Sequence, residues 1–181
     1  MASRASPGRM IFCKAGQSDM SIVLVRIDSR LVHGQVLEAW VPHVKADCIV
    51  VANNEVAGNT FQSMVMQSAV PSAIRLLITP LSETVAILNS TDLLKKRVLL
   101  LLANSSDALQ LRHLGVAYTK LNLGNMHSDA GKSRYSCTIA LDRQDIENLK
   151  QVEAQGVRIC SQCVPADREQ PWQRMLRIEG G

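Results

Sequence analysis

The chain has 181 residues, of which 46% are hydrophobic, 20% charged and 3% aromatic, with a formal net charge of +4 at pH 7. This length fits one α/β domain, and the composition is that of a folded protein, which excludes a disordered, collagen-like or coiled-coil chain. The few aromatic side chains disfavour nucleic-acid modules that stack bases on aromatic platforms, and the longest apolar run, Val98–Ala103, is too short for a membrane-spanning helix.

The beginning of the chain differs in composition from the rest. Residues 1–20 contain several Arg and Ser residues and one acidic residue, and they lack the apolar stretch of a secretory signal. We expect residues 1–20 to be a disordered N-terminal extension or a remnant of cloning, upstream of a second possible start at Met20. Residues 21–181 are expected to form one domain.

From Ser21 onward, short apolar runs alternate with amphipathic helical patterns. This alternation predicts an α/β domain with a parallel sheet flanked by helices. In chain order, the patterns predict a strand at 22–25, a helix at 36–44, a strand at 48–51, a helix at 60–69, a strand at 75–79, a helix at 80–89, a strand at 98–103, a helix at 105–113, strands at 120–123 and 135–141, and a helix at 142–155 followed by an apolar run at 157–164.

The cysteines favour a reducing compartment. They are odd in number and scattered, so a disulfide framework is not expected, and a cytoplasmic location is. The pair Cys160 and Cys163 has the spacing of a redox or metal half-site, but the sequence has no second pair of this kind. Buried strand thiols are common, so we expect no metal site here.

The densest chemistry follows the first predicted strand, in the segment Arg26-Ile27-Asp28-Ser29-Arg30-Leu31-Val32-His33-Gly34-Gln35. Ligands of open α/β sheets bind outside the carboxyl ends of the strands, where helix N-termini present unpaired N–H groups. Two arginines at such a position predict an anion site.

His33 is the candidate nucleophile of this segment. Repulsion from Arg26 and Arg30 disfavours a protonated ring, which leaves a neutral nitrogen free to attack phosphorus. The same arginines are expected to hold the oxygens of a transferring phosphoryl group, and Gly34 lets the backbone approach the phosphate. His43 and His113 fall on predicted helices, and we expect no functional role for them.

Other residues near this segment have two interpretations each. Asp28 either pairs with an arginine or orients the imidazole, or it only forms an Asx-turn at the end of the strand. Gln35 either supports the phosphate loop or simply begins a helix. His127, in the polar loop 124–131, either assists at the site or is a solvated loop residue, and the second is favoured. Ser105 and Ser106 are expected to cap a helix.

The segment from Arg26 to Gln35, with Trp40 five residues further on, closely resembles the active-site segment of the IIB component of the mannose/fructose/sorbose family of the bacterial phosphoenolpyruvate:sugar phosphotransferase system. The resemblance extends over roughly 21–179 and includes the segments 49–57, 66–71, 98–102 and 121–126.

This resemblance implies a three-layer α/β/α sandwich with a mainly parallel sheet of about six strands. It implies a phosphocarrier, formally a protein-Nπ-phosphohistidine–sugar phosphotransferase, that takes a phosphoryl group from a IIA protein onto Nδ1 of His33 and passes it to a sugar during uptake through membrane components IIC and IID. Arg30 and Arg26 would stabilise the phosphoryl charge, and Asp28 would support the loop. The resemblance implies no metal, cofactor or nucleic acid, and a cytoplasmic protein peripherally associated with the transporter. The sugar and a possible homo-oligomer stay open.

Three positions depart from the family pattern. Ser29 and Asn54 stand where the family often has Asp, and Asn125 stands in a loop that is commonly Gly-Gly-Met. The loss of two negative charges is expected to alter the match to a partner or sugar more than the phosphoryl chemistry.

Two other functions fit the same segment. A regulatory protein would use a phosphorylated His33 to control a partner without sugar transport. A non-catalytic anion-binding or nucleotide-binding module would use only the arginines, although the sequence has neither a P-loop pattern nor G-x-G-x-x-G.

Overall fold

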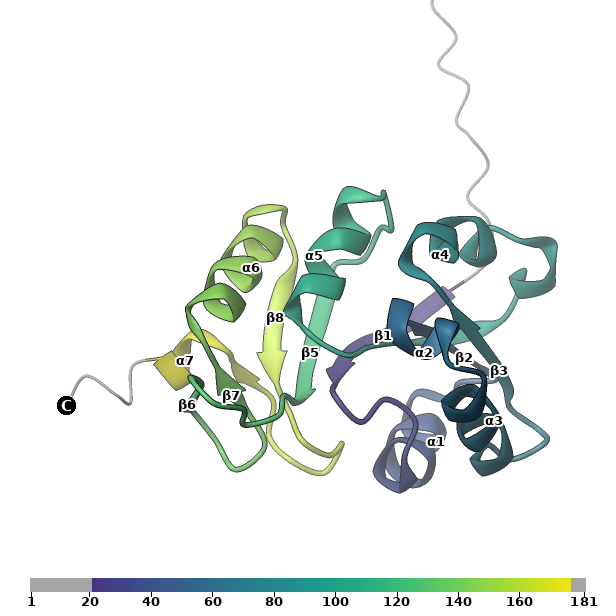
Figure 1. Ribbon diagram of the computed structural model, residues 1–181, viewed down its shortest axis with the longest axis horizontal. Coiled ribbons are helices and arrows are strands. Elements are labelled where there is room, and N and C mark those ends of the chain that lie inside the picture. The colour runs from purple at the N-terminus through teal and green to yellow at the C-terminus, as the bar shows by residue number, and fades with distance from the viewer. Residues whose placement is uncertain (1–20, 177–181) are drawn as a thin grey trace, which may run out of the picture.

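The computed structural model describes residues 21–176, in which a seven-stranded sheet lies between two layers of helices (Figure 1). The expected extension over residues 1–20 lies outside the described residues. The strand order is β3-β2-β4-β1-β5-β8-β9, and every neighbouring pair is parallel except β8 with β9. The strands are β1 (Ser21–Asp28), β2 (Cys48–Ala52), β3 (Arg75–Thr79), β4 (Arg97–Leu102), β5 (Lys120–Asn125), β8 (Arg158–Ser161) and β9 (Gln170–Pro171).

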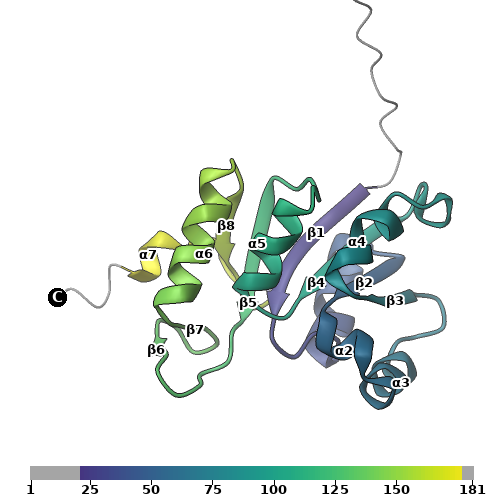
Figure 2. The same cartoon turned by 45° about the horizontal axis from the view of Figure 1, so that its top comes forward.

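Helices cover both faces of the sheet, as the α/β/α expectation requires. Figure 2 shows α4 (Leu81–Leu88), α5 (Ser105–His113) and α6 (Arg143–Ala154) in a row over one face. The other face is covered by η1 (Val36–Trp40), α1 (Val41–Val44), α2 (Asn54–Gly58) and α3 (Thr60–Ala69). The short elements η2 (Thr91–Leu93) and α7 (Gln173–Leu176) follow α4 and β9 in the chain. No helix among residues 21–176 has the length and apolar composition needed to cross a membrane.

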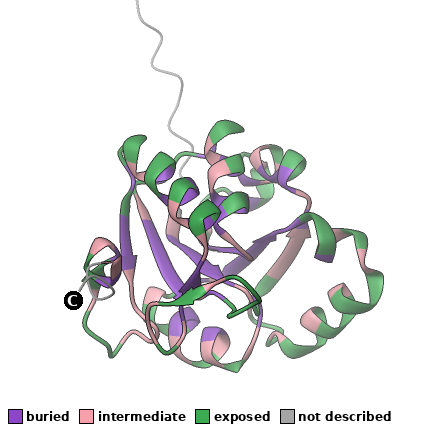
Figure 3. Cartoon of the chain, turned by 60° about the vertical axis from the view of Figure 1, so that its left-hand side comes forward, coloured by how far each residue is buried: buried purple, intermediate pink, exposed green. Residues whose placement is uncertain are grey.

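Alternation along the strands divides the interior into two cores. In β4, Leu100 and Leu102 face the core beneath α4, α5 and α6, while Leu99 and Leu101 face the core beneath η1 and α3. All four side chains are fully buried, as expected for a parallel strand covered on both faces. Figure 3 shows the strands as buried and the outer sides of the helices as exposed.

The first strand is longer than predicted. It continues past Val25 to Asp28, because it pairs with β4 as far as Ile27 and with β5 as far as Asp28. Arg26 and Asp28 therefore belong to the strand and not to the loop that follows it.

The strand predicted at 135–141 is wrong. Ala140–Leu141 (β7) pairs with Ser133–Arg134 (β6) in a separate small sheet, and Ile139 forms an isolated parallel bridge with Met126, the residue after β5. The backbone N–H groups of Tyr135 and Ser136 both donate to Ile139 O, which makes this stretch a turn. The place beside β5 in the main sheet is taken by β8, from the apolar run after α6.

The predicted helices are present, with local differences at their starts. The helix predicted at 36–44 begins with the π-helical turn η1 before it continues as α1. Asn104, and not Ser105 or Ser106, caps α5, because its side chain accepts from the backbone N–H of Asp107. Asp142 caps α6 as expected.

Candidate active site

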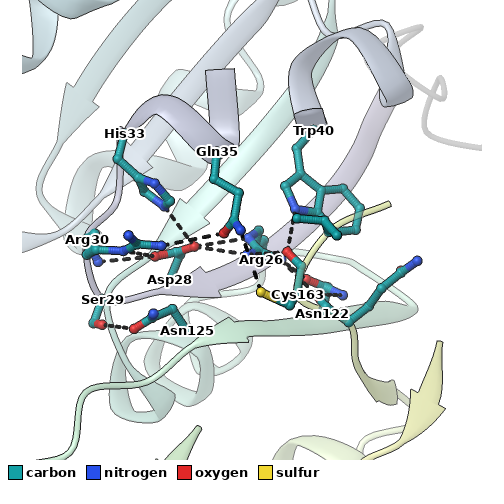
Figure 4. Close-up of polar contacts among 12 residues, drawn as sticks. Arg26, Asp28, Ser29, Arg30, His33, Gln35, Trp40, Asn122, Asn125 and Cys163 are labelled. Atoms are coloured by element: carbon teal, nitrogen blue, oxygen red, sulfur yellow. Dashed lines mark hydrogen bonds and ion pairs between the residues drawn. The ribbon is translucent and has the colours of Figure 1, made fainter. Parts of the chain in front are cut away.

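The site begins with two buried charges at the end of β1. Residues two apart on a strand face the same side of the sheet, so Arg26 and Asp28 both point toward the η1 side (Figure 4). Neither side chain has any exposed surface. Nε and Nη2 of Arg26 lie 3.3 and 3.0 Å from Oδ2 of Asp28, which makes a two-pronged ion pair.

The other hydrogen bonds of Arg26 go to acceptors on β5 and in the segment after β8. Nη1 donates to the side chain of Asn122 on β5 and to Gln162 O at 3.0 Å, and Nη2 donates to Cys163 O at 3.1 Å. Burial lowers the pKa of Arg26, and Asp28 opposes this effect. Arg26 thus ties the end of β1 to β5 and to the segment after β8.

Gly124 and Trp40 shape the space around this guanidinium. A Cβ atom at Gly124 would lie 1.8 Å from Cζ of Arg26, so only glycine permits Arg26 to lie here. Gly124 is also the extra residue of a β-bulge, since Ile27 pairs with Leu123 and Asp28 with Asn125. The Trp40 ring lies 4.8 Å from Cζ of Arg26, and its Nε1 donates to Cys163 O.

The sequence predicts that both arginines hold the phosphoryl oxygens, and the structure gives the two arginines different surroundings. Arg26 is fully buried and its N–H groups donate to acceptors within the protein, so it contacts Asp28 from the interior and does not face the surface. Arg30 remains as the arginine at the surface, with 43% of its side chain exposed.

Asp28 combines the two interpretations that the sequence left open. Its Oδ1 accepts from the backbone N–H of Arg30 at 3.2 Å, which is the Asx-turn, and lies 3.8 Å from Nε of that arginine. Its Oδ2 lies 3.0 Å from Nε2 of His33 and therefore orients the imidazole. Burial alone would raise the pKa of Asp28, but the contacts with His33 and Arg26 outweigh burial and lower it.

The chain between Asp28 and His33 is a tight, anchored turn. Leu31 donates its backbone N–H to Asp28 O at 2.8 Å and has a φ of +54°, which is strained for a branched side chain. Leu31 and Val32 are buried in the core beneath η1, which holds the turn in place. His33 O accepts from the backbone N–H groups of Val36 and Leu37, so His33 lies at the entry to the helix.

The His33 side chain is mostly enclosed, with 15% of its surface exposed. Because Nε2 faces Asp28, Nδ1 is the nitrogen on the opposite edge of the ring, and Nδ1 makes no hydrogen bond within residues 21–176. The Asp28 carboxylate lies between Arg26 and His33, as one of its two interpretations from the sequence requires. A ring that donates from Nε2 to a carboxylate has its lone pair on Nδ1.

Gly34 and Gln35 continue the surface from His33. Gly34 is exposed, and a Cβ atom there would make only an ordinary contact, at 3.9 Å from Glu38 Oε1, so packing within the protein does not require glycine. The side chain of Gln35 contacts both Arg30 and Cys163. Its Oε1 accepts from Nη2 of Arg30 at 3.5 Å, and its Nε2 donates to Sγ of Cys163 at 3.6 Å.

The positions that depart from the family pattern have different surroundings. Ser29 and Asn125 contact each other, through a side-chain hydrogen bond of 2.9 Å and a backbone hydrogen bond of 3.0 Å. Asn54 instead accepts from the backbone N–H of Leu81 at the start of α4. His127 is exposed and lines a small pocket of about 120 Å³ beside β6 and β7, with no contact to His33 among the described residues.

Sequence reasoning missed the second layer of the site. Asn122 has a sequence signal, as a polar residue within an apolar strand, whereas Trp40 has one only as part of the motif. The carbonyl groups of Gln162 and Cys163 had no sequence signal, because their contact with Arg26 depends on the neighbourhood of β5 and β8. Within residues 21–176, no cluster of three or more His, Cys, Asp or Glu side chains could hold a metal ion.

Comparisons with known proteins find similar chains over most of this sequence. The chain is 30% identical over 145 residues to the mannose-specific EIIAB component of Escherichia coli K12, covering 80% of this chain and 45% of that protein. It is 34% identical over 148 residues to the N-acetylgalactosamine-specific phosphotransferase enzyme IIB component 2 of the same organism, covering 81% of this chain and 93% of that one. The crystal structure of the IIBSor domain of the sorbose permease from Klebsiella pneumoniae superposes with a TM-score of 0.83 at 28% identity, covering 90% of this chain and 99% of that one.

The chain thus spans under half the length of the mannose-specific relative and nearly all of the other two. A family model described as the PTS system sorbose subfamily IIB component matches residues 22–180, and the chain therefore belongs to this family of sugar phosphotransferase components.

Proposed function

We propose that the protein is a phosphocarrier in which Nδ1 of His33 accepts a phosphoryl group from a IIA protein and passes it to a sugar. The observation that carries this proposal is the contact of 3.0 Å between Nε2 of His33 and the buried carboxylate of Asp28. It fixes the ring so that Nδ1 is the nucleophilic nitrogen, at the entry to a helix and beside an exposed arginine.

The first step moves a phosphoryl group from a ring nitrogen of the donor histidine to Nδ1 of His33. The lone pair of Nδ1 forms the new N–P bond while the bond between phosphorus and the donor nitrogen breaks, and the donor nitrogen keeps that electron pair. The His33 ring then carries a positive charge, which the Asp28 carboxylate balances. In the second step a sugar hydroxyl oxygen bonds to phosphorus, the N–P bond breaks, and the hydroxyl proton is released.

The residues around His33 have distinct roles in this proposal. Arg30 stabilises the charge of the phosphoryl oxygens, with Gln35 holding its guanidinium. Gly34 leaves room for the phosphoryl group, which gives a reason for a glycine that internal packing does not need. Arg26 acts through Asp28, whose charge and position it maintains.

The relatives bear on the substrate and the partners. Their names specify mannose, sorbose and N-acetylgalactosamine, so we propose a hexose or an N-acetylated hexosamine as the phosphoryl acceptor. The IIAB name of the mannose-specific relative supports a IIA domain as the donor. The protein would work in the cytoplasm, against the membrane components IIC and IID that carry the sugar.

The test is phosphorylation of the purified protein by phosphoenolpyruvate, the general phosphotransfer proteins and the IIA protein of the same organism. Intact mass should show a gain of one acid-labile phosphoryl group in wild type and none in His33→Ala. His113→Ala, which removes an exposed histidine at the end of α5, is the matched control and should be phosphorylated like wild type. An unchanged gain in His33→Ala would refute the assignment.

A second variant tests the surface arginine. Arg30→Ala should slow phosphoryl transfer by about 10² to 10³, which is the scale for losing one charge-stabilising donor. Arg143→Ala removes an exposed arginine from the start of α6 and should transfer at the wild-type rate. Equal rates for wild type and Arg30→Ala would remove Arg30 from the proposed chemistry.

A further inference from the structure

Basic residues gather at the edge of the sheet opposite to His33. His33 follows the carboxyl end of β1, whereas the turns that lead into β2, β3 and β4 lie at the amino ends of these parallel strands. We call the basic side chains of these turns and strand starts the basic edge. Its members, all exposed except the partly buried Lys96, are Lys45, Arg75, Lys95, Lys96 and Arg97.

Contacts between the three turns hold the basic edge together. The backbone N–H of Arg75 donates to Asp47 O at 3.0 Å, and the backbone N–H of Asp47 donates to Arg97 O at 3.1 Å. The guanidinium of Arg97 donates to the carbonyl groups of Val44 and Lys45 at the end of α1, at 2.7 and 2.9 Å. The basic edge is therefore one surface formed by three neighbouring strands.

The positive charge of the basic edge exceeds the negative charge beside it. The same turns contain two acidic residues, Asp47 and Asp92. Oδ2 of Asp92 pairs with Nη2 of Arg75 at 3.1 Å, and Oδ1 of Asp47 accepts from the backbone N–H of Arg97 at 3.0 Å. Three lysines make no ion pair within residues 21–176, and these are Lys45, Lys95 and Lys96.

Two of these lysines have a backbone conformation that favours glycine. The φ of Lys45 is +51° and that of Lys95 is +65°, both in the left-handed region. A residue with a Cβ atom adopts this region at a cost in free energy that glycine avoids. Backbone stability alone therefore favours glycine at both positions, and what lysine adds there is a positive charge at the surface.

The basic edge also borders an exposed apolar side chain. Leu94 directly precedes Lys95 in the turn before β4, and 41% of its surface is exposed. A leucine beside lysines fits an anionic membrane surface, where the apolar side chain enters the headgroup region and the lysines lie near phosphate groups. An acidic polypeptide needs only the charges. No member of the basic edge is aromatic, which disfavours a single-stranded nucleic acid that stacks its bases on such side chains.

We propose that the basic edge binds the anionic headgroups of a membrane surface, with Leu94 inserted between them. This contact with lipid is additional to any contact with protein components of the transporter, and it does not depend on the role of His33. Because His33 lies at the opposite edge of the sheet, its loop stays open to protein partners while the basic edge contacts lipid. A single patch of this kind gives weak, reversible binding, since stable attachment needs a second signal.

The test is co-sedimentation of the purified protein with vesicles made of equal parts phosphatidylglycerol and phosphatidylcholine. Wild type should sediment with these vesicles at low salt and stay in solution with vesicles of phosphatidylcholine alone. High salt should release the protein, because screening shortens the range of the attraction. Leu94→Ser should weaken the binding, because less apolar surface then enters the headgroup region.

A pair of variants separates the basic edge from the overall charge of the protein. Lys95→Gly should weaken vesicle binding about fivefold, which is the scale for one basic residue at an anionic surface. It should not lower the unfolding free energy, because glycine suits the φ of +65°. Lys150→Ala removes an exposed lysine from α6, lowers the net charge by the same amount and should bind vesicles like wild type.

Four results would overturn the proposal. Equal weakening by Lys95→Gly and Lys150→Ala would show that net charge, and not the basic edge, determines binding. An unchanged affinity in Leu94→Ser would exclude the inserted leucine. Absence of binding to the phosphatidylglycerol vesicles, with retention of the protein on immobilised polyglutamate, would assign the basic edge to an acidic protein segment. Release from the vesicles by inorganic phosphate at constant ionic strength would assign it to a soluble phosphate compound.

Discussion

Gly124→Ala is the smallest change that should disturb the support of the active site. The added Cβ atom would lie 1.8 Å from Cζ, 2.0 Å from Nη2 and 2.2 Å from Nη1 of Arg26. Carbon atoms in contact lie about 3.5 Å apart or more, so the guanidinium must move by roughly 1.7 Å. A displacement of this size breaks the hydrogen bonds of 3.0 Å that join it to Asp28 and Gln162 O.

The expected cost follows from the charge left behind. Removing one partner of a buried ion pair typically destabilises a protein by about 3–5 kcal/mol, and overpacking alone by about 1–3 kcal/mol. We expect Gly124→Ala to lose about 3 kcal/mol of unfolding free energy, a large part of the roughly 5–15 kcal/mol of a typical domain. The backbone at Gly124 is not left-handed, so this cost is steric and not conformational.

Urea unfolding followed by circular dichroism measures this loss, with the slope of the transition as a check on two-state behaviour. Gly58→Ala is the matched control, because a Cβ atom there meets nothing within 4 Å, and its unfolding free energy should change by less than about 1 kcal/mol. The reasoning also predicts that Gly124→Ala costs much less in an Arg26→Ala background, where the colliding group is absent. Equal costs in the two backgrounds would refute the steric explanation.

Three further predictions concern charge, the Ser29–Asn125 contact and thiol reactivity. Because the pKa of Asp28 is lowered in the folded protein, its charge stabilises the fold fully above about pH 4, and this effect is lost as the pH falls through the lowered pKa. The difference in unfolding free energy between wild type and Asp28→Asn, measured by urea titration, should therefore shrink from about pH 7 to about pH 3, and a constant difference would contradict this. In a double-mutant cycle, the effects of Ser29→Ala and Asn125→Ala on the unfolding free energy should be coupled by about 0.5–1.5 kcal/mol. Simple additivity would show that their hydrogen bond does not stabilise the protein. Cys137 is exposed, whereas burial raises the pKa of Cys48 to about 11 and also raises that of Cys160, so Ellman's reagent at pH 8 should label Cys137 in the folded protein and the other two only after unfolding; labelling of folded Cys160 would be the contrary result.

The sequence predicted the elements whose signals are local. The helix α6 begins one residue after Asp142 because that side chain and Asp145 form a capping box, which nearby residues alone can provide. The same is true of α5, although its cap is Asn104 and not the two serines after it.

The errors arose where distant residues decide the structure. The apolar run of the first strand ends at Val25, and charges such as those of Arg26 and Asp28 are unfavourable inside a sheet. They are tolerated because the two charges pair and because carbonyl groups more than 130 residues away accept from Arg26. The apolar pattern at 135–141 reaches this sheet only through a single bridge between Ile139 and Met126, and β8 pairs with β5 in its place.

The sequence predicts which residues form the site, but it does not predict which of them are buried and which are exposed. The motif identified His33, Arg30 and Asp28, and the Asx-turn needs only local geometry. The separation of Arg26 from the surface depends on Gly124 and Trp40, which approach it from β5 and η1. Only the assembled sheet shows that one arginine is structural and the other is exposed.

The contact between Trp40 and Arg26 gives the protein an internal optical signal. The chain contains two tryptophans, and the other one, Trp172, lies beside β9 with its Nε1 bonded to Glu153. Indole emission responds to nearby charge. A change in charge at Asp28 or Arg26 therefore alters the emission of Trp40, whereas Trp172 lies away from both residues, at the edge of the sheet. Ultraviolet fluorescence of a Trp172→Phe variant would therefore follow events at His33 in real time, without an attached dye.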